Sequence, residues 1–180
     1  KIEEAKRLLE EAKQKNVQII LPVDGYAAKI PEGTELTVET IENAEHKAVI
    51  LNDNKEIAKE QIMEGFNILD IGEQTIENCI HALENAKTIC WNGPLGYTEA
   101  PSFAKGTQSI ANYIAATNAK CVIGGGDSVA AIKKVKKEAM ENEKTQEQFS
   151  NIYLSTGGGA SLEFLEGKEL PGIKALEDKK

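Results

Sequence analysis

Short glycine runs are the features of this sequence best suited to chemistry, because each follows an apolar stretch and precedes a helical pattern. A glycine run lets a ligand approach the backbone closely, and the free amides at the start of the next helix attract an anion. The runs are Gly72 after NILDI, Gly93 and Gly96 after TICWN, Gly124 to Gly126 after KCVI, and Gly157 to Gly159 after NIYLST. Phosphate is the ligand that this repeated pattern predicts, and an ordinary tight turn is the alternative at each single run.

The elements that must position these runs alternate between strand and helix. Helical patterns are expected over 2–15, 56–65, 75–84, 102–116, 128–140 and 161–166, and strands over 17–23, 67–71, 87–91, 120–124 and 151–155. TELTVET and KAVIL predict two further strands before residue 54. Short apolar strands between helices predict a doubly wound, mostly parallel, Rossmann-like sheet, buried on both faces in a three-layer α/β/α domain. Ligands bind such sheets beyond the carboxyl ends of the strands, where the glycine runs lie.

Composition excludes several classes of function. A chain of 180 residues with 41% hydrophobic and 28% charged residues is long enough for a core of its own. Its 21 basic and 29 acidic residues give a net charge of −8, which argues against nucleic acid or an acidic membrane as a partner. No apolar run approaches the roughly 18 residues of a membrane span. Three cysteines with no C-x-x-C pair indicate reduced thiols in a cytoplasmic protein.

Two common phosphate fingerprints are missing from the sequence. There is no G-x-x-x-x-G-K-[ST] loop, and no G-x-G-x-x-G follows the first expected strand. The second absence disfavours a nicotinamide-dependent dehydrogenase.

The motifs that are present resemble those of one family. WNGPLG with Glu99 three residues on, FAKGT (103–107), VIGGGDS (122–128) and STGGGASLEFLEGKELPGI (155–173) are similar to the C-terminal, nucleotide-binding domain of phosphoglycerate kinase. LPVD (21–24) and LDIG (69–72) also fit, so the resemblance covers nearly all of residues 1–180. It implies a phosphotransferase of glycolysis that reversibly converts 1,3-bisphosphoglycerate and MgADP into 3-phosphoglycerate and MgATP. It also implies a cytoplasmic enzyme that is a monomer when complete.

The resemblance implies a nucleoside site along the WNGPLG turn. Glu99 matches the acid that accepts hydrogen bonds from the ribose, with an exposed surface glutamate as the alternative. Asn92, Pro94 and Gly96 match nucleotide contacts. Leu69 matches a residue that lines the adenine pocket, and a core position is an equal alternative for it.

The resemblance also implies roles for the two triple-glycine loops. Gly125, Gly126, Asp127 and Ser128 match the loop that meets the nucleotide phosphates, and Asp127 matches the ligand of Mg²⁺. The alternative for Asp127 is an N-cap of the next helix. Together with Gly126, the residues Gly158 and Gly159 match the catalytic amides that face the transferring phosphoryl group, with a structural turn as the alternative. Ser128 stands where the family usually has threonine, which keeps the hydroxyl.

Other parts of the family pattern differ or are not found. Tyr97 and Thr98 follow the glycine bend where small apolar residues and then Phe are usual. A Gly-Ala-Lys segment, a further glycine loop and the N-terminal domain that binds the phosphoglycerate are not found in these 180 residues. We therefore expect a C-terminal domain without its first strand–helix segments, which supplies part of the nucleotide site and is inactive alone. The alternative is a stand-alone module that binds a nucleotide or phosphate without transfer.

Overall fold

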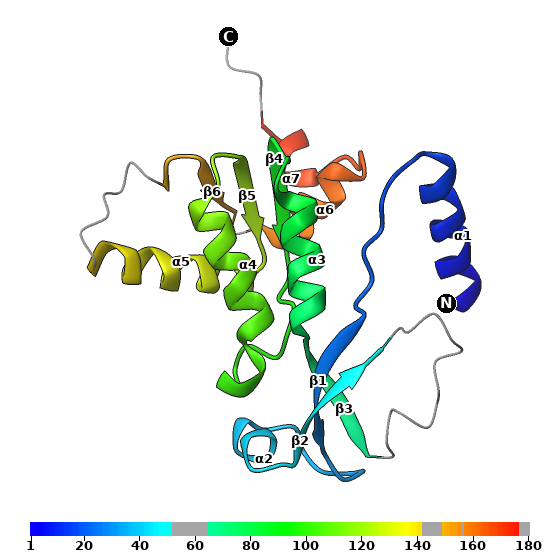
Figure 1. Cartoon of the computed structure of the whole chain (residues 1–180). Helices are drawn as coiled ribbons and strands as arrows, with labels where there is room; N and C mark the ends of the chain where they lie inside the picture. The colour runs from blue at the N-terminus through cyan, green and yellow to red at the C-terminus, as the bar shows by residue number, and fades with distance from the viewer. Residues whose placement is uncertain (52–64, 142–148, 156, 177–180) are drawn as a thin grey trace.

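The computed structural model describes residues 1–51, 65–141, 149–155 and 157–176 (Figure 1). Its elements follow one another along the chain as α1 (Ile2–Gln14), β1 (Asp24–Lys29), α2 (Val38–Glu42), β2 (His46–Ile50), β3 (Phe66–Ile71), α3 (Glu73–Leu83), β4 (Thr88–Asn92), the 3₁₀ turn η1 (Pro101–Phe103), α4 (Lys105–Ala116), β5 (Lys120–Gly124), α5 (Gly126–Glu141), β6 (Ile152–Leu154), α6 (Gly158–Leu165) and α7 (Pro171–Lys174). None of these described helices is both long and apolar enough to cross a membrane.

Strands β4, β5 and β6 form a parallel sheet in that order. Thr88 pairs with Lys120, and Cys121 pairs with Ile152. Helix α4 lies between β4 and β5 in the chain and α5 between β5 and β6, which are the crossovers that parallel strands require. The predicted α/β class, with a parallel sheet and flanking helices, is confirmed.

The main core lies between this sheet and helices α3, α4 and α5. Figure 1 shows α3 and α4 side by side along the sheet, and α4 also packs on α5. The core is built from the buried residues Ile89, Trp91, Ile110, Ala111, Ile114, Ala119, Cys121, Ile123, Ile132, Val135, Phe149 and Ile152. It fixes the carboxyl ends of the three strands relative to the helices that follow them.

The other face of the described parallel sheet is open to solvent. Val122 is aligned with Cys90 on one side and Tyr153 on the other, and all three are exposed. Buried and exposed residues therefore alternate along these strands, which is typical of a sheet with one covered face. The prediction that both faces of these strands are buried is wrong within the described residues.

A second sheet, in the order β2-β1-β3, is antiparallel. Tyr26 of β1 pairs with Ala48 of β2 and Asp70 of β3. NILDI is thus a strand as predicted, but it pairs with β1 and not with the parallel strands. The physical reason is that β1 and β2 form a hairpin-like pair whose free edge accepts β3.

Two sequence predictions in the first third of the chain are also wrong. The strand expected over 17–23 does not form, because no described strand lies beside these residues to complete a ladder. TELTVET contains helix α2, which Thr37 caps by accepting a hydrogen bond from the Thr40 amide at 3.1 Å. The helix predicted for 56–65 lies, apart from Gly65, outside the described residues.

Candidate functional site

Three glycine loops meet at the carboxyl ends of β4, β5 and β6. A Cβ added to Gly158 would lie 2.7 Å from the backbone N of Gly125, and one added to Gly125 would lie 2.7 Å from Oδ1 of Asn92. A Cβ on Gly124 would lie 3.4 Å from the Cα of Gly158. We call Asn92, Gly124, Gly125 and Gly158 the glycine junction. Its three glycines lie together as the sequence predicts, and the contacts within the junction require these three residues to be small.

Gly126 and Gly159 lie beside the junction but have a different environment. Apart from their own helix backbone and chain neighbours, no described atom lies within 4 Å of a Cβ added to either of them, and both are exposed. Neither has a φ in the left-handed region. Packing therefore does not explain why these positions lack a side chain. Each lies in the first turn of a helix of eight residues or more, where free amides carry partial positive charge.

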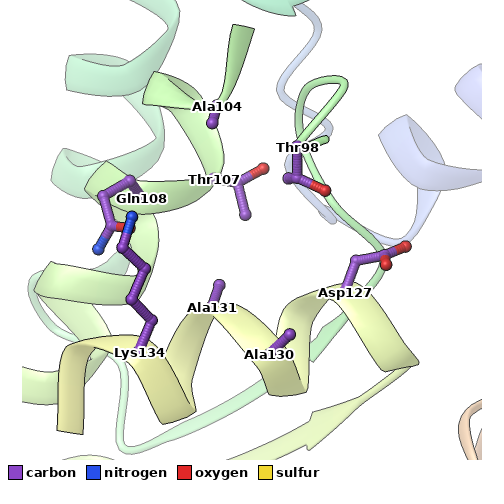
Figure 2. Close-up of a pocket in the computed structure, with 8 residues that line it drawn as sticks. All are labelled: Thr98, Ala104, Thr107, Gln108, Asp127, Ala130, Ala131 and Lys134. Carbon is purple, nitrogen blue, oxygen red and sulfur yellow. The ribbon is translucent and has the colours of Figure 1, made fainter. Parts of the chain in front are cut away.

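Asp127 lies at one end of a pocket of about 200 Å³ between helices α4 and α5 (Figure 2). Thr98 lies near it, whereas Gln108 and Lys134 lie at the opposite end. The pocket is lined by Thr98, Ala104, Thr107, Gln108, Asp127, Ala130, Ala131 and Lys134. The exposed Asp127 is the second residue of α5, inside the helix, and so it does not occupy the N-cap position.

The chain from Asn92 to Tyr97 is held by three hydrogen bonds, and we call it the nucleotide turn after the contacts that the family resemblance predicts for it. Gly93 N donates to Ser128 Oγ at 2.9 Å, and Leu95 N donates to Thr107 Oγ1 at 2.9 Å. Tyr97 N donates to the carbonyl oxygen of Leu69 at 2.7 Å. The Ser128 hydroxyl, on a fully buried residue, thus faces the nucleotide turn.

Leu69 and Gly96 both have structural roles in this region. Leu69 is half-buried and packs against a second core cluster that includes Ile41 and Phe103. A Cβ on Gly96 would lie 2.2 Å from Asp70 Oδ1. For these two residues, contact with a nucleotide remains a prediction beside a role in packing.

The remaining predicted residues of the nucleoside site lie on the surface. Pro94 and Glu99 are exposed, and Glu99 follows directly after Thr98 of the α4–α5 pocket. Within the described part of the chain, Glu99 has no hydrogen bond or ion pair that would explain it structurally. The ribose role of Glu99 stays a prediction.

Helix α3 begins against a carboxylate of the chain itself. Asp24 accepts hydrogen bonds from Gln74 N at 2.9 Å, Thr75 N at 2.8 Å and Thr75 Oγ1 at 2.5 Å. Burial pushes the pKa of the Asp24 carboxyl upward, but the hydrogen bonds from Thr75 and Gln74 outweigh burial and hold this pKa below its usual value. The glycine run at Gly72 therefore serves Asp24, whose carboxylate occupies the space of the missing side chain.

Helix α4 begins in the same way against Asp70. This carboxylate is 2% exposed and accepts from Gly106 N and Ile71 N, both at 2.9 Å. Burial raises the pKa of Asp70, and the hydrogen bonds from these amides offset the effect only in part. Asp70 links β3 to the start of α4, immediately before Thr107.

Sequence reasoning missed the roles of Asp24, Asp70, Thr75 and Thr107. LPVD, LDIG and FAKGT are visible as motifs. However, only the folded chain shows that the acids in the first two cap helices distant in sequence, and that the threonine in the third accepts from the nucleotide turn.

Comparisons with known proteins all lead to one family. The family model described as phosphoglycerate kinase matches residues 1–168. A phosphoglycerate kinase of Pseudothermotoga lettingae is 44% identical over 181 residues, covering 100% of this chain and 39% of the relative. One of Fervidobacterium nodosum is 45% identical over 184 residues, with the same two coverages. The chain thus spans about two-fifths of the length of these relatives.

A solved structure gives the same result. The phosphoglycerate kinase of Coxiella burnetii matches with a TM-score of 0.70 and 35% identity, over 96% of this chain and 37% of that chain. The family model, the relatives and the solved fold lead to one conclusion: this chain belongs to the phosphoglycerate kinase family.

Proposed function

We propose that this chain forms the nucleotide-binding side of a phosphoglycerate kinase, which reversibly transfers a phosphoryl group between 1,3-bisphosphoglycerate and MgADP. The observation that carries the proposal is the pair of open glycines, Gly126 and Gly159, beside the glycine junction. Two helix N-termini that open next to each other, free of side chains, suit the phosphates of a nucleotide.

The phosphate end of the proposed site is made mainly of backbone groups. Phosphoryl transfer needs positioning and charge stabilisation more than covalent chemistry, and preorganised amides supply both. In this proposal the amides near Gly126, Gly158 and Gly159 face the transferring group. Gly125 and the backbone of Ser128 complete the loop around the other phosphates.

Asp127 is the proposed protein ligand of Mg²⁺. The described residues contain no group of three or more potential metal ligands. A single exposed carboxylate at a helix start still suits Mg²⁺, which keeps several waters and is shared with substrate phosphates. When bound there, the ion neutralises phosphate charge, and Asp127 holds it at the amino end of α5.

The nucleoside end of the proposed site is the nucleotide turn and the residues after it. Glu99 would accept hydrogen bonds from the ribose, while Asn92, Pro94, Gly96 and Leu69 would lie along the nucleoside.

The phosphoglycerate side of the reaction is proposed to come from outside this chain. The chain spans about two-fifths of its relatives, and transfer needs a second substrate site that closes over the nucleotide and excludes water. We propose that the 180 residues bind ADP or ATP but do not catalyse transfer alone. The complete enzyme is proposed to be a cytoplasmic monomer with no nucleic-acid or membrane partner.

A fluorescence titration tests nucleotide binding. Trp91 is the one tryptophan in the sequence and directly precedes Asn92, so its emission reports on the carboxyl end of β4. We expect a saturable change with ADP that is stronger with Mg²⁺, and no change with NADH. Calorimetry provides an independent readout. No saturable signal by either method would contradict the proposal.

A second experiment separates the kinase from a stand-alone binding module. The chain is joined to the preceding part of the Pseudothermotoga lettingae phosphoglycerate kinase, and ATP formation is followed by a coupled assay. We expect turnover from the hybrid and none from the 180 residues alone. A hybrid that folds and binds ADP without turnover favours the module.

A further inference from the structure

The three hydrogen bonds of the nucleotide turn have a regular order. Alternate amides donate inward: Gly93 to Ser128 on α5, Leu95 to Thr107 on α4, and Tyr97 to Leu69 on β3. The residues between them, Pro94 and Gly96, are two of the predicted nucleotide contacts. Three separate elements thus fix the held positions. The exposed Pro94 between them is left to the ligand, whereas Gly96 is itself packed against Asp70.

Thr107 is the middle anchor of this turn. Its side chain is 2% exposed, and its hydroxyl lies 2.9 Å from the Leu95 amide. The position of Thr107 is itself fixed, because the preceding amide of Gly106 donates to the buried carboxylate of Asp70. A continuous series of contacts therefore runs from Asp70 through the start of α4 to Leu95.

The anchor matters because the first half of the turn has few other restraints, whereas Gly96 is also bridged to Asp70. Gly93 has a φ of 98°, in the left-handed region, and glycine has more backbone freedom than any other residue. Residues 92 and 94 are exposed. Ordering such a segment when a ligand binds costs affinity, and a turn that is already held avoids that cost.

We propose that Thr107 is a positioning residue for nucleotide binding: its hydroxyl holds the Leu95 amide and thereby preforms the turn that meets the nucleoside. The proposal rests on the proposed nucleotide site. It assigns Thr107 to the nucleoside end and not to the phosphate end, because the glycine junction has contacts of its own.

The test compares two threonine variants with equal burial. Thr107→Val removes the acceptor of Leu95, and Thr75→Val removes a hydroxyl that is also 2% exposed but accepts from Val23 N near the start of α3. Both variants should lower the melting temperature, because each leaves a half-buried amide without its partner. Only Thr107→Val should weaken ADP binding, by about tenfold, which corresponds to the loss of one hydrogen bond of ordinary strength.

Ligand fragments locate the effect. In calorimetry, Thr107→Val should weaken adenosine as much as ADP while leaving inorganic pyrophosphate unchanged. Thr107→Ser, which keeps the hydroxyl, should restore ADP affinity to within about twofold. Amide exchange at Leu95 should be faster in Thr107→Val than in Thr75→Val.

The outcomes separate this inference from the proposed function. If the unaltered chain binds no ADP, the proposed function fails and the role of Thr107 fails with it. If the unaltered chain binds ADP and folded Thr107→Val binds it equally well, only the role of Thr107 is overturned. Equal losses of affinity for ADP in both valine variants would also overturn it, because they would show a general effect of stability.

Discussion

Helices α3 and α4 begin against carboxylates of their own chain, whereas α5 and α6 each have an open glycine in their first turn. Asp24 accepts from the first turn of α3, and Asp70 accepts from the first turn of α4. No side chain caps α6, and the Cβ positions of Gly126 and Gly159 face no described atom. The starts of α3 and α4 are thus already occupied by carboxylates of the protein, and the starts of α5 and α6 remain available for the anion of a ligand.

The glycines in the two regions differ accordingly. A Cβ at Gly72 would overlap the Asp24 carboxylate, and one at Gly96 or Gly106 would lie 2.2 or 2.5 Å from Asp70 Oδ1. These glycines make room for the protein itself. A glycine after a strand is therefore ambiguous in sequence, and only the atoms around it decide whether its space is left for a ligand.

Among variants at the starts of α5 and α6, Gly158→Ala is expected to have the largest effect on ADP binding. The new methyl group would lie 2.7 Å from the backbone N of Gly125, and backbone atoms cannot yield cheaply. We expect a loss of about 1–3 kcal/mol in the free energy of unfolding and at least about 100-fold weaker ADP binding, because both phosphate loops shift. Urea unfolding measures the loss of stability, and calorimetry measures the affinity for ADP. Wild-type affinity in a folded variant would show that the junction does not shape the site.

At the start of α3, Asp24→Asn should lower the stability of the protein and leave its affinity for ADP unchanged. The amides of Gln74 and Thr75 now donate to the two carboxylate oxygens of Asp24, and asparagine offers only one acceptor oxygen. We therefore expect a loss of about 1–2 kcal/mol in the free energy of unfolding at pH 7, with unchanged ADP affinity. The folded pKa of Asp24 lies below its unfolded value, so its stabilisation is present above the unfolded pKa and is lost as the pH falls through the folded pKa.

The pH dependence distinguishes this cap from other effects of the substitution. The difference in urea midpoint between wild type and Asp24→Asn should shrink as the pH falls below about 4. Glu32→Gln, at an exposed acid between β1 and α2, serves as the charge control and should show no such difference at pH 7. A difference that stays constant from pH 7 to pH 3.5 would mean that the ionised carboxylate is not the stabilising group.

The sequence predicts the parallel half of the molecule better than the antiparallel half. The expected strand at 120–124 coincides with β5, and expected helices lie within two residues of α5 and include most of α3. These segments have periodic apolar residues, which are the strongest local signal of a helix or a strand. Residues 17–22 have an equally apolar pattern but no neighbouring strand, and pairing is decided by tertiary contacts that local sequence does not contain.

The candidate site shows the same division. Its glycine loops are recognisable because backbone approach restricts residue type strongly. The anchoring roles of Thr107 and Asp70 are not recognisable, because a buried hydroxyl or carboxylate has no local pattern until its donor is known.

Asp127→Asn should have a smaller effect on ADP binding than Gly158→Ala. The amide cannot replace a carboxylate as a ligand of a hard cation, so the gain in ADP affinity on adding Mg²⁺ should fall by about tenfold. Without Mg²⁺, ADP affinity should stay within about twofold of wild type or rise, because a negative charge near the phosphates is removed. In the hybrid enzyme, Asp127→Ala should cut turnover severely while the thermal transition stays within a few degrees. An unchanged Mg²⁺ dependence would remove Asp127 from the metal site.

Gly159→Ala should have the smallest effect and is the sharpest comparison, because it adds the same methyl group one residue from Gly158. No described atom lies within 4 Å of the added carbon, and alanine is favoured over glycine in a helix. The free energy of unfolding should therefore rise by up to about 1 kcal/mol, while ADP affinity falls by roughly threefold to tenfold because the methyl group lies where the phosphates approach. A stabilised variant with unchanged affinity for ADP would show that the opening at α6 is not used by the nucleotide. In that case the amides of α5 alone would have to bind the phosphates.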